Sequence, residues 1–311
     1  MKPESKGRLD PFVAPDHYEI NYKHIDFKRN QFSGSVRLKF TVSSDETEDE
    51  VPQGLVLHAL DLIVFSAKLI KSPHEIKAQE IRYNFPNQTV EMIFGDDFLW
   101  EKGGSYQVLI DFQGNLNDLM RGLYRSTYVG LDGKTHTMAT TQFEPTDARR
   151  AFPCLDEPAM KATFAVTVTV PTTLQCISNT PYASVHTEMV GNVPMKTVTF
   201  QTTPKMSTYL VALVVGEFDC ISTTYNGIQT TVFTVPGKAH LGQFCLDTAY
   251  QAIDLYQKLF DIPYPLVKSD LLAIPDFAAG AMEVRLRFLE SSPKWHSSKG
   301  VSLFRYRIGD V

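Results

Sequence analysis

The stretch "SGSVRLKFTV" (residues 33–42) alternates apolar and polar side chains through most of its length. Its apolar members are Val36, Leu38, Phe40 and Val42. Alternation with period two, carried by β-branched and aromatic residues, predicts a strand with one dry face. The segments "TFAVTVTV" (163–170), "KTVTFQTT" (196–203) and "TYLVALVVGEF" (208–218) predict further strands. Several strands separated by turns favour a β-sandwich.

Composition indicates a folded chain of about two domains, at roughly 100–200 residues each. The 311 residues are 43% hydrophobic and 21% charged, and the net charge of −5 gives no basic field for nucleic acid. No apolar run reaches the ~18–20 residues of a membrane span. Because the first residues lack the apolar core of a signal peptide and the four cysteines form no CxxC pair, we expect reduced thiols and a cytoplasmic location.

The pattern changes near Gly216. From residue 239 to 260, apolar residues recur at steps of three and four, which predicts an amphipathic helix. "SDLLAIPDFAAGAME" (269–283) predicts a strand with a bend at Pro275. We therefore expect a flexible N-terminus (1–9), a β-domain (10–216), the start of an α/β domain (217–283) and a basic tail (284–311).

Familiar catalytic motifs are missing. The eight histidines include no HExxH, since "HEIKA" at His74 has Ala78 where a second histidine belongs. No GxSxG elbow and no GxGxxG motif is present. "GLDGKT" (130–135) has two residues between its glycines where a phosphate loop needs four, so Asp132-Gly133 predicts a hairpin turn.

The segment "TTQFEPTDARRAFPCLDEPAMKATF" (140–164) is too irregular for a strand and too apolar for a free loop. We expect a structured loop with internal ion pairs, in which the charged residues chiefly fix the loop. Glu144 follows a β-run and could instead point into a cleft. The charged residues of the segment are Glu144, Asp147, Arg149, Arg150, Asp156 and Glu157.

"GAME" (280–283) combines small residues with one carboxylate. Small residues let another backbone approach closely, and an extended segment can add a peptide as a neighbouring strand. A peptide's α-ammonium has three donors and a charge that must be matched when it leaves water, so Glu144 and Glu283 together would bind it better than either alone. The alternative, which the residues alone favour, is that Glu283 is a surface group at a strand end.

Four stretches together resemble the gluzincin zinc aminopeptidase family, of the aminopeptidase N and puromycin-sensitive type. They are "VAPDHYEINY", "TQFEPTDARRAFPCLDEPAMKATF", "MSTYLVALVVGEF" and "FDIPYPLVKSDLLAIPDFAAGAME". The resemblance implies a mostly β fold: an N-terminal saddle-like β-sandwich followed by the truncated start of a thermolysin-like α/β catalytic domain. It also implies removal of N-terminal residues from peptides with a free N-terminus, and Zn²⁺ in full-length members.

The resemblance assigns roles to individual residues. Glu283 is similar to the family's glutamate that holds the substrate amine, and Glu144 to a second carboxylate with the same role. Gln142 and Met282 match positions that line the pocket for the first side chain. Gly280 and Ala281 match positions whose backbone pairs with the peptide.

The match to the family breaks off after Glu283. The family continues Gly-Ala-Met-Glu-Asn-Trp-Gly and then a helix with HExxH, whereas here Val284, Arg285 and Leu286 follow. We therefore expect no zinc at a catalytic site and no hydrolysis by this chain alone. The tail (284–311) has six Lys and Arg residues against two acidic ones. A frame error, an alternative exon or a premature end would produce it, and a genuine basic binding tail is the competing hypothesis.

Two functions follow. The first is the N-terminal part of a zinc aminopeptidase that keeps the amine-binding glutamates without the zinc site. The second is a non-catalytic pseudo-peptidase that serves as an interaction or scaffold module. Neither predicts a nucleic-acid partner, a transmembrane segment or a particular oligomeric state.

Overall fold

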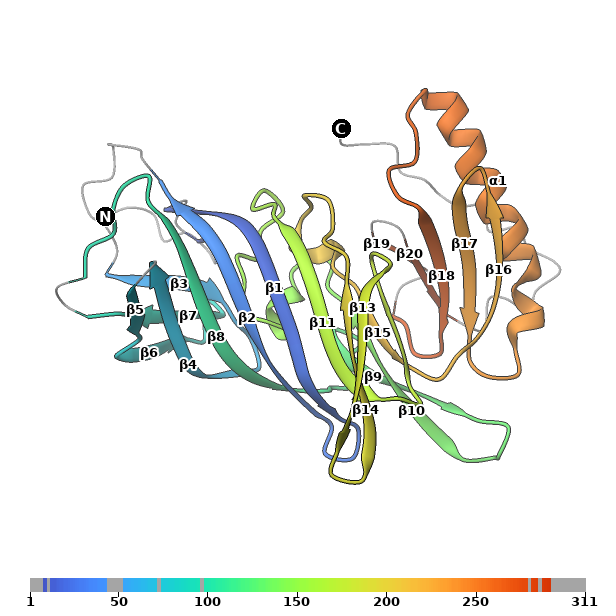
Figure 1. The fold of residues 1–311 in the computed structure, drawn as a ribbon, viewed down its shortest axis with the longest axis horizontal. Helices are drawn as coiled ribbons and strands as arrows, with labels where there is room; N and C mark the ends of the chain where they lie inside the picture. Colours follow the sequence, from blue (N-terminus) through green and yellow to red (C-terminus); the bar gives the residue numbers. More distant parts are fainter. Residues whose placement is uncertain are drawn as a thin grey trace.

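The computed structural model describes residues 8–9, 12–43, 53–71, 74–95, 98–278, 281–284 and 287–291. Within these residues strands predominate, and they form four sheets. Three sheets lie in the N-terminal part, and the fourth, with a helix on its outer side, lies at the C-terminal end (Figure 1). The predicted fold class, mostly β followed by an α/β unit, is confirmed.

The largest sheet has eight strands among the described residues and includes the stretch that opened the sequence analysis. That stretch lies in β2 (Gln31–Val42), where Val36 and Leu38 are completely buried. β2 runs antiparallel to β1 (Val13–Asp26), and β1 pairs in parallel with β11 (Thr163–Pro171). The other strands are β13 (Tyr182–Val190), β14 (Val193–Phe200), β8 (Ser105–Asn115), β4 (Leu62–Lys71) and β5 (His74–Lys77), in the order β13-β14-β11-β1-β2-β8-β4-β5.

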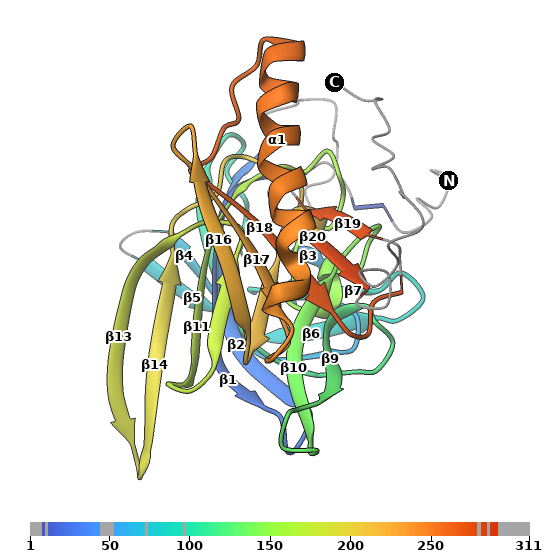
Figure 2. The ribbon, with the colours of Figure 1, turned by 90° about the vertical axis from the view of Figure 1, so that its right-hand side faces the viewer.

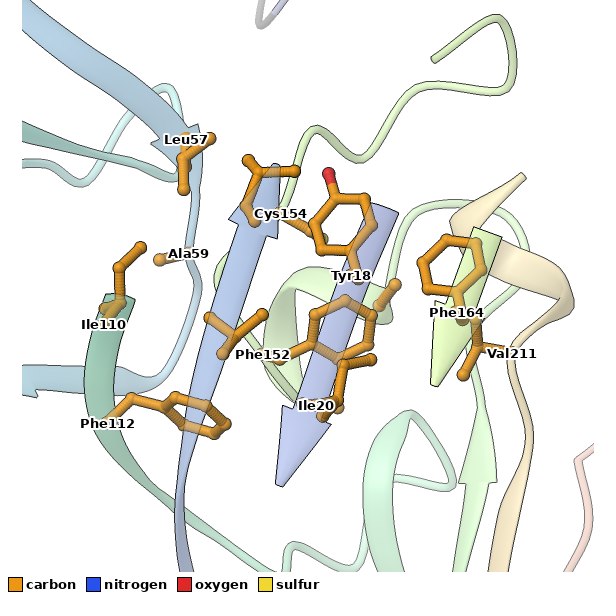
Figure 3. Packing of buried hydrophobic residues seen from close by; sticks show 14 of the residues in the cluster. Tyr18, Ile20, Leu57, Ala59, Ile110, Phe112, Phe152, Cys154, Phe164 and Val211 are labelled. Atoms are coloured by element: carbon orange, nitrogen blue, oxygen red, sulfur yellow. The ribbon is translucent and has the colours of Figure 1, made fainter. Parts of the chain in front are cut away.

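Aromatic residues fill the core beneath this sheet. Tyr18 stacks on Phe164 with ring centroids 5.0 Å apart, and Phe152 meets Tyr18 edge-on at 6.1 Å (Figure 3). Phe152 comes from the irregular segment 140–164 and not from a strand. Its burial therefore ties that segment to the core, as the apolar composition of the segment predicted.

Two smaller sheets complete the N-terminal part. One contains β3 (Gly54–His58), β7 (Thr89–Ile93) and β6 (Glu80–Asn84). The other contains β12 (Gln175–Ser178), β15 (Leu213–Gly216), β10 (Thr135–Gln142) and β9 (Gly122–Val129), in that order. β9 and β10 form an antiparallel hairpin whose turn includes Gly133 at φ 73°, so the predicted Asp132-Gly133 turn is confirmed.

The segment 208–218 is not the single strand that its apolar sequence predicted. It begins with the 3₁₀ turn η2 (Thr208–Leu210), and only β15 is extended in the sheet. The Asn179 side chain explains the break. Its Nδ2 donates to the Leu210 carbonyl oxygen and its Oδ1 accepts from the Ala212 N–H, both at 2.8 Å. These backbone groups are thus bonded to a side chain, and the β-ladder starts only after them.

The fourth sheet contains β16 (Asp219–Tyr225), β17 (Ile228–Thr234), β18 (Lys268–Ile274), β20 (Arg287–Ser291) and β19 (Ala281–Val284), in that order. Helix α1 (Gln243–Phe260) lies across this sheet on the face turned away from the N-terminal sheets (Figures 1 and 2). The predicted helix over 239–260 is confirmed, except that its first residues form the 3₁₀ turn η3 (Ala239–Gly242).

Strand β18 is apolar on both faces because both are covered. Leu271 belongs to a cluster with Leu246 and Ala249 of α1. The next residue, Leu272, points the opposite way and belongs to a cluster with Met138 and Val214 of the N-terminal part. Successive side chains of a strand point to opposite faces, so β18 joins the helix to the β12–β15–β10–β9 sheet.

The tail (284–311), for which the sequence analysis names no strand, contains a strand in its first residues. Residues 287–291 form β20, which pairs in parallel with β18 and antiparallel with β19. A five-residue strand between two others gives little periodic signal, because its place depends on its neighbours and not on its own alternation. The remainder of the tail, from residue 292, lies outside the described residues.

Candidate functional site

Gln142 and Glu144 lie where β10 leaves its sheet. β10 ends at Gln142, and the next residue, Phe143, is buried edge-on against Phe152 with ring centroids 6.1 Å apart. Glu144 is exposed in the turn that follows. The Gln142 Nε2 donates a long hydrogen bond, 3.5 Å, to the Glu144 carbonyl oxygen. The buried Phe143 thus anchors a turn on which the two predicted residues are neighbours.

One face of β10 carries two buried polar atoms that have no hydrogen-bond partner among the described residues. They are the Thr140 Oγ1 and the Gln142 Oε1. The two residues are separated by one position and therefore share a face of the strand. A buried polar atom without a partner is costly, so these two atoms mark a polar spot in the packed interior on this face of β10.

The charged residues that follow Glu144 bind one another. The Arg149 Nε donates to the Asp156 Oδ2 at 3.0 Å, and both side chains are buried. The Arg150 Nε donates to the Asp147 Oδ1 at 2.7 Å, and its Nη1 pairs with Asp61. The expected internal ion pairs are therefore confirmed. Because these groups bond within the loop and to its immediate support, the loop is held rigid at the end of β10.

Strand β19 presents its side chains in strict alternation. Ala281 and Glu283 are exposed, whereas Met282 between them is only 3% exposed. β19 is the last strand in the order of its sheet, next to β20. Within the part of the chain that the structure describes, one edge of β19 is therefore unpaired, and an unpaired edge is where an extended peptide can add as a strand.

The two segments that carry the glutamates meet through one apolar cluster. Met282 of β19 belongs to a cluster with Met138 of β10 and Val214 of β15. Met138 shares its face of β10 with Gln142, four residues on. The cluster thus places β19 against the same face of the sheet on which the unpaired Thr140 and Gln142 atoms lie.

The predicted site residues are described except one. Glu144 and Glu283 are both exposed, and in the ranges described here neither carboxylate forms a hydrogen bond or an ion pair. Gln142 and Met282 lie on β10 and β19, as given above, and Ala281 begins β19. Gly280 lies outside the described residues.

The residues present do not fit the zinc that the family resemblance implies. The sequence contains no HExxH, and its eight histidines include no pair at the i, i+4 spacing. No three His, Cys, Asp or Glu side chains of the described ranges come together as a metal site. Nor does any described helix have the length and hydropathy needed to cross a membrane.

Comparison with known families matches most of the chain. The model of the Peptidase M1 N-terminal domain matches residues 14–210, and that of the Peptidase family M1 domain matches residues 244–289. The second match extends past Glu283, the last residue for which the sequence suggested similarity. The two matches occur in the same order as the two parts of the structure: the first covers the β-rich part, and the second covers the beginning of the α/β unit.

The chain belongs to the peptidase M1 family. It is 40% identical over 285 residues to Aminopeptidase M1 of Arabidopsis thaliana, covering 90% of this chain and 31% of that protein. It is 42% identical over 278 residues to the puromycin-sensitive aminopeptidase of Caenorhabditis elegans, covering 89% and 28%. Endoplasmic reticulum aminopeptidase 1 of Homo sapiens is 35% identical over 285 residues, covering 90% and 29%. The chain thus spans less than a third of the length of these relatives.

Sequence reasoning missed two features next to the site. One is strand β20. The other is Asp276, which follows Pro275 in the connection between β18 and β19 and hydrogen-bonds to β9. An aspartate after a proline ordinarily indicates a turn, and no local signal shows that its partners lie about 150 residues away in the chain.

Proposed function

We propose that this chain is the N-terminal part of an M1 aminopeptidase and binds the free amino terminus of a peptide between Glu144 and Glu283. The observation that carries the proposal is the packing of Met282 in one cluster with Met138. This shared cluster brings the edge strand β19 to the β10 face, and an exposed glutamate lies near the end of each segment.

Electrostatics supports two carboxylates at such a site. A peptide α-ammonium is a cation with three donors, and its transfer from water to a protein surface is favoured when anionic acceptors replace the lost hydration. An internal peptide bond has no such cation, so a two-carboxylate site selects peptide ends. In this proposal the backbone of Gly280 and Ala281 pairs with the peptide, and Gln142 and Met282 contact its first side chain.

The proposal separates recognition from hydrolysis. The relatives are named aminopeptidases, and M1 family members are zinc enzymes, but the residues of this chain do not fit a zinc site. We therefore propose that the 311-residue chain binds peptide termini without cleaving them. A cytoplasmic location and the absence of a nucleic-acid partner stay predictions from the sequence.

A binding assay tests the amine site directly. A short peptide with a free N-terminus and the same peptide N-acetylated, each with a C-terminal fluorophore, are titrated with the chain, and the ratio of the two affinities is the amine preference. We expect Glu283→Gln and Glu144→Gln each to reduce this preference about tenfold, or roughly 1.4 kcal/mol, because a charge-assisted contact is lost. Equal affinity of the unmodified chain for both peptides would contradict the proposal.

The matched control removes an exposed carboxylate elsewhere. The control variant is Glu188→Gln. Glu188 lies on β13, a strand of the largest sheet, and every side chain of β13 is exposed. This substitution changes the net charge by the same amount as the site variants, so it separates local binding from a general electrostatic effect. We expect its amine preference to equal that of the unmodified chain.

A non-catalytic interaction module is the second candidate. The observation that favours it is a stripe of exposed apolar side chains on the face of α1 turned away from its sheet, comprising Phe244, Leu255 and Leu259. Large exposed apolar groups on one face often mark a protein contact. This function predicts a cooperative melt and a stable protein complex without any preference for free amino termini, and the same titration therefore distinguishes the two candidates.

A further inference from the structure

Asp276 joins the connection between β18 and β19 to strand β9 through four hydrogen bonds. Its Oδ2 accepts from the Ser126 Oγ at 3.0 Å and from the Thr127 N–H at 2.9 Å. Its own backbone N–H donates to the Ser126 Oγ at 3.0 Å. Its carbonyl oxygen accepts from the Tyr124 hydroxyl at 2.7 Å. The carboxylate, the N–H and the carbonyl oxygen of Asp276 are thus all bonded to β9, at Tyr124, Ser126 and Thr127.

The partners of Asp276 cannot easily move. Tyr124 and Ser126 are completely buried and lie on the same face of β9, two residues apart. Burial, and secondarily the Asp276 carboxylate, raises the pKa of the Tyr124 hydroxyl, which therefore remains a neutral donor. Hydrogen bonds to an ionised acceptor are about twice as strong as neutral ones, so the two bonds at Oδ2 hold the connection firmly on β9.

Strand β9 is also the neighbour that fixes the end of β10. The two strands pair from Val129↔Thr135 to Gly122↔Gln142. Glu144 lies two residues beyond this register and Glu283 lies seven residues beyond Asp276. One rigid hairpin therefore supports the segment of each glutamate, Glu144 directly through β10 and Glu283 through Asp276.

We propose that Asp276 is a positioning residue that holds β19, and with it Glu283, at a fixed separation from Glu144. The inference rests on the proposed function for its consequence, the binding of a peptide's amino terminus, but the fixed separation itself is a property of this chain. The packing of Phe277 and Met282 in the shared apolar cluster contributes to the same docking. Apolar contacts are non-directional, whereas the bonds of Asp276 set the register of the connection along β9.

The bonding pattern predicts different results for two substitutions. Both side-chain bonds are accepted by a single oxygen, Oδ2, so Asp276→Asn can keep them with its amide oxygen. Asp276→Ala removes both. Ser126→Ala removes a donor to the carboxylate and an acceptor from the Asp276 N–H at once. We therefore expect Asp276→Asn to keep the positioning, with bonds weakened by the loss of the charge, and the two alanine variants to lose it.

The first measurement is the distance between the two glutamate positions. Spin labels are attached after Glu144→Cys and Glu283→Cys, with Cys220 and Cys245 replaced by serine because they are not buried. The distance distribution is recorded by pulsed electron resonance with and without Asp276→Ala, Asp276→Asn and Ser126→Ala. We expect a narrow distribution that broadens with either alanine variant and stays narrow with asparagine.

The matched control is Asp219→Ala. Asp219 also accepts a backbone N–H, that of Gly237, at 2.7 Å, but this bond does not involve the β18–β19 connection. A narrow distribution in this variant shows that losing a carboxylate–backbone bond elsewhere in the chain does not broaden the distance distribution between the two labels. If Asp276→Ala unfolds the chain, Tyr124→Phe is the second variant, since it removes only the hydroxyl that donates to the Asp276 carbonyl oxygen. Partial broadening is then expected.

The second measurement is the amine preference in the original glutamate background. Asp276→Ala is expected to lower it, and to have no further effect in a Glu283→Gln chain, because Asp276 acts through Glu283. An unchanged distance distribution, or an effect that adds to that of Glu283→Gln, overturns the positioning role. If the unmodified chain has no amine preference, the proposed function fails, and the positioning of β19 is then decided by the distance distribution alone.

Discussion

Arg149 and Asp156 show at the scale of single residues why the loop after Glu144 has a definite shape. The Asp156 carboxylate accepts from the Arg149 Nε at 3.0 Å and from the Thr208 hydroxyl at 2.6 Å. The Arg149 Nη1 donates to the Gln88 side chain, and the Asp156 N–H donates to the His58 Nδ1. A buried charge is tolerated only when it is paired and fully hydrogen-bonded, and this network satisfies that condition.

Breaking this pair is expected to be strongly destabilising. Arg149→Met leaves the Asp156 carboxylate buried without its cation, and such a change costs about 3–5 kcal/mol of the free energy of unfolding. Urea unfolding at pH 7 measures the loss. Replacing both partners is expected to cost less than the sum of the single changes. The control is Arg82→Met, whose partner Glu80 is exposed, and a similar loss there would contradict the prediction.

Some residues of the candidate site can be predicted from the sequence, and others cannot. As predictions, Glu144 and Glu283 follow from a two-carboxylate argument together with the family resemblance of the motifs around them. Asp276 did not, because a hydrogen bond to Ser126 and Thr127 depends on the docking of two segments and leaves no local pattern. Motifs suggest residues that are expected to contact a ligand more readily than residues that hold them in place.

At the scale of elements, the β1–β2 hairpin shows how one small residue permits the pairing of central strands. The register of the hairpin shifts between Tyr22 and His24, and Gly34 of β2 lies opposite this irregularity. A Cβ at Gly34 would lie 2.2 Å from the Asn21 carbonyl oxygen. Because that oxygen is backbone and β2 also pairs with β8, no flexible side chain can give way.

Gly34→Ala is therefore expected to destabilise the chain. A clash with backbone in a packed sheet forces strand shifts that cost about 1–3 kcal/mol. Chemical denaturation monitored by circular dichroism measures the change. Ser33→Ala, at the adjacent and half-buried position, is the control and should have a much smaller effect. Equal stability of the Gly34→Ala variant and the unmodified chain would show that β1 and β2 separate more easily than their register suggests.

Elements with strong periodicity were predicted correctly. Segments whose backbone bonds to a distant side chain, or whose strand conformation depends on neighbouring strands, were not. The helix over 239–260 and β2 follow from repeats of side-chain character within one segment. The prediction of a single strand over 208–218 was wrong because the Asn179 side chain, distant in sequence, bonds to the backbone at residues 210 and 212. β20 was missed because its strand conformation comes from its place between β18 and β19.

At the scale of the whole molecule, several buried acids can ionise only when the fold opens. Burial raises the pKa of Tyr18, Tyr22 and the Cys154 thiol. Burial also raises the pKa of the Cys176 thiol from 9.0 to about 12, although Lys196 opposes the shift. The folded state therefore holds these protons at pH values where the unfolded chain releases them.

Stability is expected to fall in alkali. A folded-state pKa above the unfolded value gives a contribution that is complete below about pH 9 and is lost as the pH rises toward 12. For Cys176 alone the slope approaches about 1.4 kcal/mol per pH unit in this range. Urea unfolding between pH 8 and 11 should show the decline, and Cys176→Ala should make it shallower. An identical slope in that variant would mean that Cys176 ionises equally well in both states.

The amino-acid sequence alone is enough to predict the fold class, the helix and the strands that alternate clearly, and it is also the source of the prediction that two glutamates form the site. These features depend on repeats or motifs within one segment, and local periodicity carries them. The tertiary structure decided which strands pair, such as β1 with β11, and where β20 is inserted. It also decided that Asp276 bonds to β9 across 150 residues. Hydrogen bonds between distant segments depend on where the packed chain brings them together, and no single segment contains that information.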